Sequence, residues 1–160
     1  MEVRRATVQD AAELARGMAA VADEGRWLAT PAGTPADSLV DRFTAAAIAE
    51  DHLLLAVEDD GRLVGCLGLH PARADGVLDL GMWLLAPARG RGGGRALVRA
   101  ALDHAQTIGA HKVQLEVFPD NGRAISLYSG CGFEIEGVRR SHYRRPDGTL
   151  RSAVMMARLL

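Results

Sequence analysis

The residues most suggestive of chemistry form a glycine-rich run that also carries three arginines. The run reads Arg89-Gly90-Arg91-Gly92-Gly93-Gly94-Arg95 and lies between an apolar segment and an amphipathic one. The first amides of a helix have no intrahelical partner, and the helix dipole adds partial positive charge there. Because Gly92 and Gly94 lack side chains, a phosphate can approach their backbone closely. The run therefore predicts a phosphate-binding site at the start of a helix.

Three other phosphate-binding motifs do not fit this run. A Walker loop needs a Lys-Ser/Thr pair after its last glycine, and Arg95-Ala96 follows here. A dinucleotide fingerprint that began at Gly90 would need a glycine at its sixth position, where Arg95 stands. A glycine-rich kinase loop would need a strand on each side and a catalytic loop downstream, and the sequence offers neither. The arginines also argue against a merely flexible turn.

A second group of polar residues follows the predicted helix. Asn121 stands at the start of another helical segment, where asparagine is a favoured cap, and Tyr128 follows two turns later on the same face. Glu116 lies in the alternating segment Leu115-Glu116-Val117. For Tyr128 the alternative is a core aromatic residue, and for Glu116 it is a place on the polar face of an exposed strand.

Hydrophobic periodicity predicts the elements that position these residues. We expect helices over about residues 8–21, 39–48, 95–108 and 121–130, and strands at 3–7, 52–57, 62–70, 77–85, 112–117, 133–138 and 150–158. The Asp60-Gly61 pair predicts a tight hairpin turn between two of the strands. The loop at residues 24–38 is long enough to be functional. Residues 139–148 are expected to form a polar connection.

Composition bounds the class of protein. Of 160 residues 48% are apolar, which is enough for the core of a single domain over residues 1–160. A formal net charge of −1 gives no reason to expect nucleic acid or an anionic membrane as a partner. No apolar run approaches the roughly 20 residues that span a bilayer, and no signal-peptide core follows the first residues. We therefore expect a soluble, cytoplasmic protein.

Neither the cysteines nor the histidines predict a metal site. Cys66 and Cys131 lie in apolar segments without metal-ligand or redox spacing, so we expect reduced thiols. The five histidines show no paired spacing with acidic or cysteine partners. The basic run at residues 139–145 is short and precedes a Pro-Asp-Gly turn, so we interpret it as a solvated hairpin end rather than an RNA site.

Together these motifs resemble those of the GNAT superfamily of N-acetyltransferases. Its pyrophosphate loop has the pattern Arg/Gln-x-x-Gly-x-Gly/Ala, which residues 89–94 match. Gly93 stands where an aliphatic residue is common, which predicts a looser helix start. Residues 121–133 match the later family pattern Asn-x-x-Ala-x-x-Leu-Tyr-x-x-x-Gly-Phe. The resemblance covers about the C-terminal half of the chain.

The resemblance implies an α+β (mixed α/β) fold and acetyl-CoA as cosubstrate, with no metal. A mostly antiparallel, twisted sheet of about six or seven strands would be flanked by about four helices, and its fourth and fifth strands would splay apart. The pantetheine arm would lie in that gap and the pyrophosphate on the glycine loop, with Arg91 and Arg95 adding charge. The implied coenzyme-binding residues are Met82, Trp83, Leu84, Arg89, Gly90, Arg91, Gly92, Gly93, Gly94, Arg95 and Asn121.

The resemblance also implies catalytic roles for direct acetyl transfer to an amine. Tyr128 would be the general acid, the amide of Leu84 the oxyanion contact, and Glu116 the general base, directly or through water. Asp79 on the preceding strand is a competing base, and water alone is a third option.

The acceptor and the assembly stay open at this stage. A primary amine of a small molecule or a protein N-terminus is expected, and members of the superfamily also leave room for a homodimer. The alternative is a non-catalytic module of the same fold that senses acyl-CoA, against which the intact Tyr128 and Glu116 argue.

Overall fold

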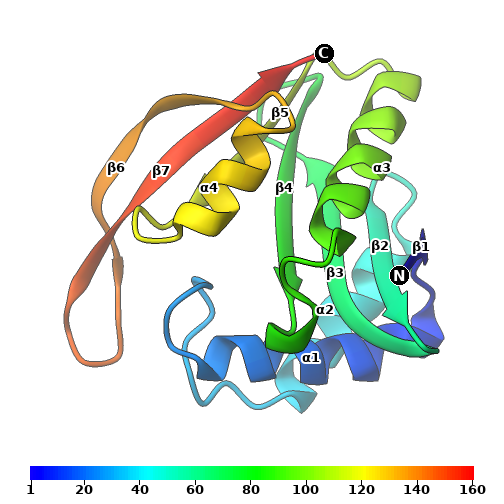
Figure 1. Ribbon diagram of the computed structural model, residues 1–160, viewed down its shortest axis with the longest axis horizontal. Coiled ribbons are helices and arrows are strands. Elements are labelled where there is room, and N and C mark those ends of the chain that lie inside the picture. Colours follow the sequence, from blue (N-terminus) through cyan, green and yellow to red (C-terminus); the bar gives the residue numbers. More distant parts are fainter.

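A seven-stranded sheet forms the middle of the molecule, with strand order β1-β2-β3-β4-β5-β7-β6 (Figure 1). The computed structural model describes residues 1–160 throughout. Its neighbouring strands are antiparallel except for β4 and β5, which run parallel. This arrangement confirms the expected mixed fold. The strands are β1 (Glu2–Arg5), β2 (Leu53–Asp59), β3 (Arg62–Pro71), β4 (Val77–Leu84), β5 (Lys112–Val117), β6 (Glu134–Arg144) and β7 (Leu150–Leu159).

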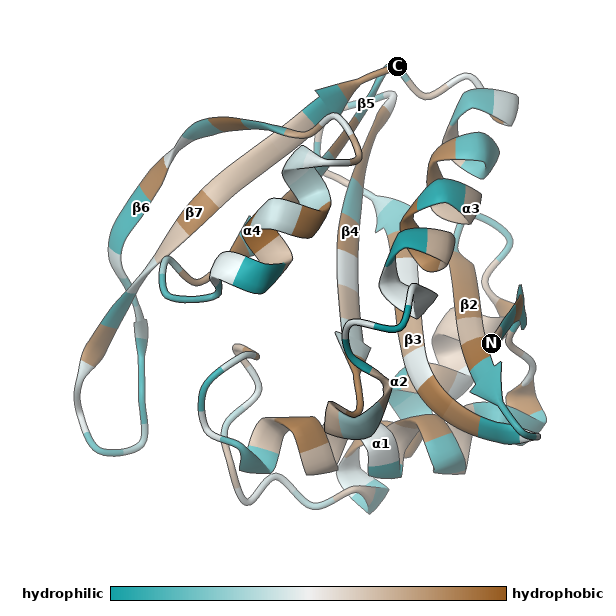
Figure 2. Ribbon diagram, in the orientation of Figure 1, coloured by the Kyte–Doolittle hydropathy of each residue, from teal (hydrophilic) through white to brown (hydrophobic).

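Four α-helices cover the two faces of the sheet. Strand β2 is buried on both sides, so its alternate residues serve two cores: Leu55 packs with α3, whereas Leu54 packs with α1. Figure 2 shows the resulting apolar strands and the striped surface of α3. None of the helices has both the length and the apolar character that crossing a bilayer requires. The helices are α1 (Ala11–Asp23), α2 (Asp37–Ile48), α3 (Gly93–Thr107) and α4 (Gly122–Ser129), with short 3-10 turns η1 (Val8–Asp10) and η2 (Ala86–Ala88).

The splay between β4 and β5 is present. The two strands pair only near their starts, and Asp79 with Gln114 is the last pair. The amide of Leu85 donates to β3. Because backbone groups alternate in direction along a strand, the N–H groups of Met82 and Leu84 must then point into the gap. The gap therefore has an unpaired strand edge along one side.

Local sequence signals predicted most of the helix and strand ends correctly. Asp60 and Gly61 both have positive φ, 50° and 74°, as a two-residue hairpin turn requires. Gly109 ends α3 with φ 76°. Asn121 caps α4, its Oδ1 accepting a hydrogen bond from the amide of Ala124 at 3.2 Å.

The prediction was wrong at β6, which continues to Arg144 instead of ending near residue 138. The expected polar connection at 139–148 therefore shrinks to residues 145–149. The pairing of β6 with β7 is irregular at two places, between Ile135 and Gly137 and between Arg139 and Tyr143. Within the second irregularity, Ser141 has φ 49°. These bulges interrupt the two-residue alternation on which a prediction of strand depends.

Candidate active site

A cleft of about 850 Å³ lies where β4 and β5 diverge. Residues of β4, β5, β6, α4, the glycine loop and the loop after α1 surround it, so segments distant in sequence meet here. Of the predicted site residues, only Arg91 and Gly93 lie outside this lining. The predicted residues that line the cleft are Met82, Trp83, Leu84, Arg89, Gly90, Gly92, Gly94, Arg95, Glu116, Asn121 and Tyr128.

The glycine loop presents free backbone donors to the cleft. The amides of residues 90–95 donate no hydrogen bond within the protein, and the first bond of α3 runs from the amide of Ala96 to the carbonyl of Gly92 at 3.0 Å. Gly90 and Gly92 have positive φ, 78° and 92°, which L side chains rarely adopt. Free amides at a helix start form a site for an anion.

Two glycines at the start of α3 face opposite directions. A Cβ on Gly94 would lie 3.1 Å from side-chain atoms of Leu127 and Met82, so these side chains would have to shift to admit one beside the cleft. A Cβ on Gly93 would lie 2.8 Å from the sulfur of Met1, away from the cleft. Helix α3 begins at Gly93, and the looser helix start stays a prediction.

Two of the loop arginines are neutralised within the protein. The guanidinium of Arg89 forms two hydrogen bonds with Glu24, of 2.8 and 2.5 Å, and its Nε donates to the carbonyl of Leu84 at 2.9 Å. This pairing lowers the pKa of Glu24. Arg91 pairs with Asp59 at 2.6 Å. Both side chains therefore hold the loop in place, and neither is a free cation.

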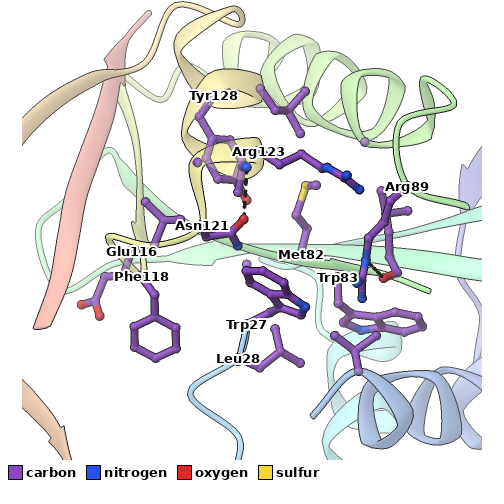
Figure 3. A pocket seen from close by; sticks show the side chains of 18 of the residues that line it. Trp27, Leu28, Met82, Trp83, Arg89, Glu116, Phe118, Asn121, Arg123 and Tyr128 are labelled. Atoms are coloured by element: carbon purple, nitrogen blue, oxygen red, sulfur yellow. Dashed lines mark hydrogen bonds between the residues drawn. The ribbon is translucent and has the colours of Figure 1, made fainter. Parts of the chain in front are cut away.

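Two other arginines remain available to the cleft. Arg95 contacts only the carbonyl of Gly130, at 3.3 Å, and Arg123 in the first turn of α4 makes no hydrogen bond or ion pair. Figure 3 shows Arg123 extending from α4 across the cleft toward Arg89. Arg123 was not predicted, because an exposed arginine in a helix has no signal of its own in the sequence.

Tyr128 is buried, with 6% of its surface exposed, and its ring packs against Phe133. Its hydroxyl has no hydrogen-bond partner. Nε1 of Trp83 is the only fully buried side-chain polar atom that lacks a partner, so the hydroxyl of Tyr128 is not fully buried. The hydroxyl of Tyr128 therefore opens into the cleft that the residue lines. Burial raises the pKa of this phenol well above its ordinary value. Tyr128 thus stays protonated and can donate a proton.

Asn121 uses the two ends of its amide differently. Its oxygen is committed to the helix cap, whereas its nitrogen has no partner within the protein. Figure 3 shows this nitrogen facing the cleft, on the Met82 side of α4. The same residue can therefore cap α4 and donate to a ligand.

Glu116 lines the cleft with both carboxylate oxygens engaged. Its Oε2 accepts a hydrogen bond from the hydroxyl of Tyr143 at 2.5 Å, and its Oε1 pairs with Arg139 at 2.5 Å. The competing base Asp79 does not line the cleft and accepts a hydrogen bond from Gln114 at 2.9 Å. The geometry therefore favours Glu116 over Asp79 as the carboxylate of this site.

The far end of the cleft is closed by the loop after α1, which two arginines hold against the β6–β7 hairpin. Arg145 is buried, so the interpretation of this basic run as a solvated hairpin end was wrong at this residue. Arg151 pairs with Asp120 at 2.5 Å and lies 3.9 Å from the ring centroid of Phe118. The carbonyls that accept from these two arginines belong to residues 25, 26, 28 and 29.

The contacts of Arg145 and Arg151 with the loop after α1 give this end of the cleft an apolar and aromatic lining. Trp27 and Leu28 of the loop face the cleft opposite Asn121, and Phe118 lies beside Glu116 (Figure 3). The indole N–H of Trp27 donates to Glu24, which also binds Arg89. The wall at this end is therefore tied to the glycine loop through a single carboxylate.

Comparison with known proteins gives one family. Residues 21–133 match the model of the acetyltransferase (GNAT) family. Mycothiol acetyltransferase of Pseudarthrobacter chlorophenolicus is 36% identical over 130 residues, which cover 69% of this chain but 39% of that protein. This chain thus spans about two-fifths of that relative. The uncharacterised N-acetyltransferase YjgM of Escherichia coli is 30% identical over 135 residues, 82% of this chain and 81% of that protein.

Solved structures agree on the fold. Ribosomal-protein-alanine N-acetyltransferase of Brucella melitensis superposes with a TM-score of 0.87 over 100% of both chains, at 22% identity. The acetyltransferase yncA of Salmonella typhimurium, solved with its cofactor acetyl-CoA, gives 0.86 over 99% of this chain and 93% of that one, at 18% identity.

The two tyrosines of the cleft, the only ones in the chain, allow a direct test of these environments. Burial raises the pKa of Tyr143 to about 12 and that of Tyr128 further. We expect no tyrosinate absorbance at pH 10, where a free tyrosine is about half ionised. Absorbance of one residue at that pH, assigned with a Tyr128→Phe variant, would contradict this environment.

The same shift has a consequence for stability. The unfolded chain releases its phenolic protons near pH 10, whereas the folded chain keeps them, so the stability present below pH 10 is lost as the pH rises further. For Tyr128 the loss is up to about 1.4 kcal/mol per pH unit, which urea unfolding at increasing pH measures.

Proposed function

This chain belongs to the GNAT family of acetyltransferases, and on that basis we propose that it transfers an acetyl group from acetyl-CoA directly to a primary amine. Residues 1–160 form a single domain of this kind in our proposal. The observation that carries it is the set of free amides at residues 90–95, placed beside the unpaired edge of β4. A pyrophosphate and an extended, peptide-like arm are the chemical groups that such donors accept.

The residues present fit the coenzyme. The amides of residues 90–95 and the cation of Arg95 would hold the pyrophosphate. The backbone of Met82 and Leu84 and the side-chain nitrogen of Asn121 would hold the pantetheine arm. Its thioester supplies the activated acetyl group. Arg89 and Arg91 would hold the loop in place through their carboxylate partners and would not bind the phosphate directly.

Three groups would carry the chemistry. The amide of Leu84 donates toward the oxyanion that forms when an amine attacks the thioester carbonyl. Tyr128 gives its proton to the departing thiolate, for which its unpartnered and protonated hydroxyl is suited. Glu116 takes a proton from the ammonium form of the acceptor, since only a neutral amine is a nucleophile.

The acceptor is an amine that fits between the loop after α1 and the β6–β7 hairpin. Relatives of this chain are named for different acceptors: L-amino acids in an Escherichia coli enzyme 33% identical over 105 residues, and spermidine in a Vibrio cholerae enzyme 43% identical over 56 residues. We propose a small-molecule amine or a protein N-terminus, bounded by Trp27 and Phe118.

Thiol release from acetyl-CoA tests the proposed function. We expect release that depends on at least one class in a panel of amino acids, peptides with free N-termini, polyamines and antibiotic amines. Binding of acetyl-CoA in calorimetry without release for any class would favour the sensing module. No binding of acetyl-CoA at all would remove the whole proposal.

Replacing Arg95 and Arg91 separately compares an arginine without a carboxylate partner with one that is paired. Arg95→Gln should weaken acetyl-CoA binding roughly tenfold, about 1.4 kcal/mol, because a hydrogen bond to a charged phosphate is lost. Arg91→Gln, the matched control in the same loop, should change the Kd by less than about twofold, because Asp59 neutralises Arg91. Calorimetry measures both, and an equal loss for the two variants would contradict this assignment.

Tyr128→Phe removes the proposed proton donor without removing the ring. Turnover should fall by roughly 10²–10⁴-fold, while acetyl-CoA affinity stays nearly unchanged. The loss should persist at high pH, since the leaving thiolate still lacks its donor. Steady-state kinetics over a range of pH measures this, and unchanged turnover would exclude Tyr128 from the mechanism.

A further inference from the structure

Tyr143 of β6 is the cleft residue that contacts the carboxylate of Glu116. Its hydroxyl donates to Oε2 at 2.5 Å, which is short for a hydrogen bond between oxygen atoms. Its ring packs edge-on against Phe118, with ring centroids 5.7 Å apart. Both Tyr143 and Glu116 line the cleft, so the pair is accessible to an acceptor.

A bulge in β6 builds this contact. In a regular strand Arg139 and Tyr143 would lie about 13 Å apart along the strand. Here they stand opposite Ala153 and Arg151 of β7, which are only two residues apart. The bulged residues between them, including Ser141 with φ 49°, take up the extra length. The bulge therefore brings two side chains of one strand to one carboxylate, a use of bulges that is common beside active sites.

The three groups form a short chain from the cleft to the solvent. Arg139 pairs with Oε1 of Glu116 from the outer side, where 47% of the Arg139 side chain is exposed. Tyr143 occupies the other carboxylate oxygen. Because Tyr143 and Arg139 engage both oxygens of Glu116, an amine in the cleft can exchange a proton with this carboxylate through the hydroxyl of Tyr143.

We propose that Tyr143 is a further catalytic residue, which passes a proton from the acceptor ammonium to Glu116. This inference rests on the proposed acetyl transfer and names the route by which its nucleophile is made. The ammonium gives one proton to the phenolic oxygen while the phenol gives its own proton to Oε2. The amine ends neutral, Tyr143 ends as the neutral phenol it was, and Glu116 ends protonated.

The proton then leaves Glu116 for water, to which 25% of that side chain is exposed. No oxidant or further reactant is needed. The high pKa of Tyr143, about 12, keeps the phenol from holding the negative charge itself, so it only passes the proton.

Other charged groups around Tyr143 need a control. Arg151 faces it from β7 and is paired with Asp120. The imidazole of His142 lies edge-on at 4.9 Å between ring centroids. His142→Gln therefore separates the contribution of this imidazole from that of the relay.

The test is the pH dependence of kcat/KM for Tyr143→Phe, with an amine found in the thiol-release panel. We expect a loss of roughly 10–100-fold near pH 7 that shrinks to less than about twofold above the pKa of the amine, where the neutral form needs no relay. Glu116→Gln should give the same profile. The double variant should lose no more than either single one, because both residues serve one step.

Two outcomes would overturn the relay. If Tyr143 only holds Glu116 in place, the freed carboxylate will act directly and Tyr143→Phe will keep its activity at neutral pH. If Tyr143 serves packing or acceptor binding, the loss will be equal at every pH. Tyr143→Phe retains the ring against Phe118, and Glu116→Gln provides the same test with Tyr143 intact.

Controls separate this inference from the proposed function. His142→Gln and Arg140→Gln, which alter the same strand, should keep the wild-type pH profile. Acetyl-CoA affinity should be unchanged in every variant. A wild-type protein that acetylates no amine would overturn the proposed function, whereas an active wild type with a pH-independent Tyr143→Phe loss would overturn only the relay.

Discussion

The divergence of β4 and β5 is the constraint on which the rest of the structure depends. Beyond Asp79 and Gln114 the two strands stop pairing, and β4 keeps backbone donors without partners in the middle of the sheet. Unpaired backbone groups away from water cost free energy, so a fold keeps them only where water or a ligand satisfies them. The glycine loop adds a second set of free amides at the same place. In the proposed function, both sets bind one extended ligand that carries phosphates.

Charge in this region is divided between structure and binding. Arg89 and Arg91 come from the loop that looks most like a phosphate site, yet each is paired with a carboxylate. Their effect is to fix the path of the loop, whose amides at residues 90–95 donate no hydrogen bond within the protein. Fixed dipoles bind a phosphate without first having to be ordered, which is an advantage over flexible cations. Arg95 and Arg123 then add the free positive charge.

The parts of the site that sequence could predict are those set by local rules. The glycine loop, the cap at Asn121 and the place of Tyr128 follow from helix starts and helical spacing, and the structure has all three. The pairs that sequence missed join residues far apart in the chain: Arg89 with Glu24 across 65 positions and Tyr143 with Glu116 across 27. For Tyr143 the bulge in β6 also broke the alternation that would have marked its strand. Such contacts depend on the tertiary fold, and no local pattern encodes them.

The two tyrosines of the cleft illustrate how surroundings assign a role to one type of side chain. Tyr128 has no hydrogen-bond partner and lies among apolar residues, so its proton is held until a stronger base appears in the cleft. Tyr143 is bound to a carboxylate, so its proton already has an acceptor. A protonated hydroxyl without an acceptor is suited to protonate a departing thiolate. A hydroxyl that is hydrogen-bonded to a carboxylate is suited to take part in the loss of a proton from an amine. In the proposed transfer, Tyr128 on α4 takes the first role and Tyr143 on β6 takes the second.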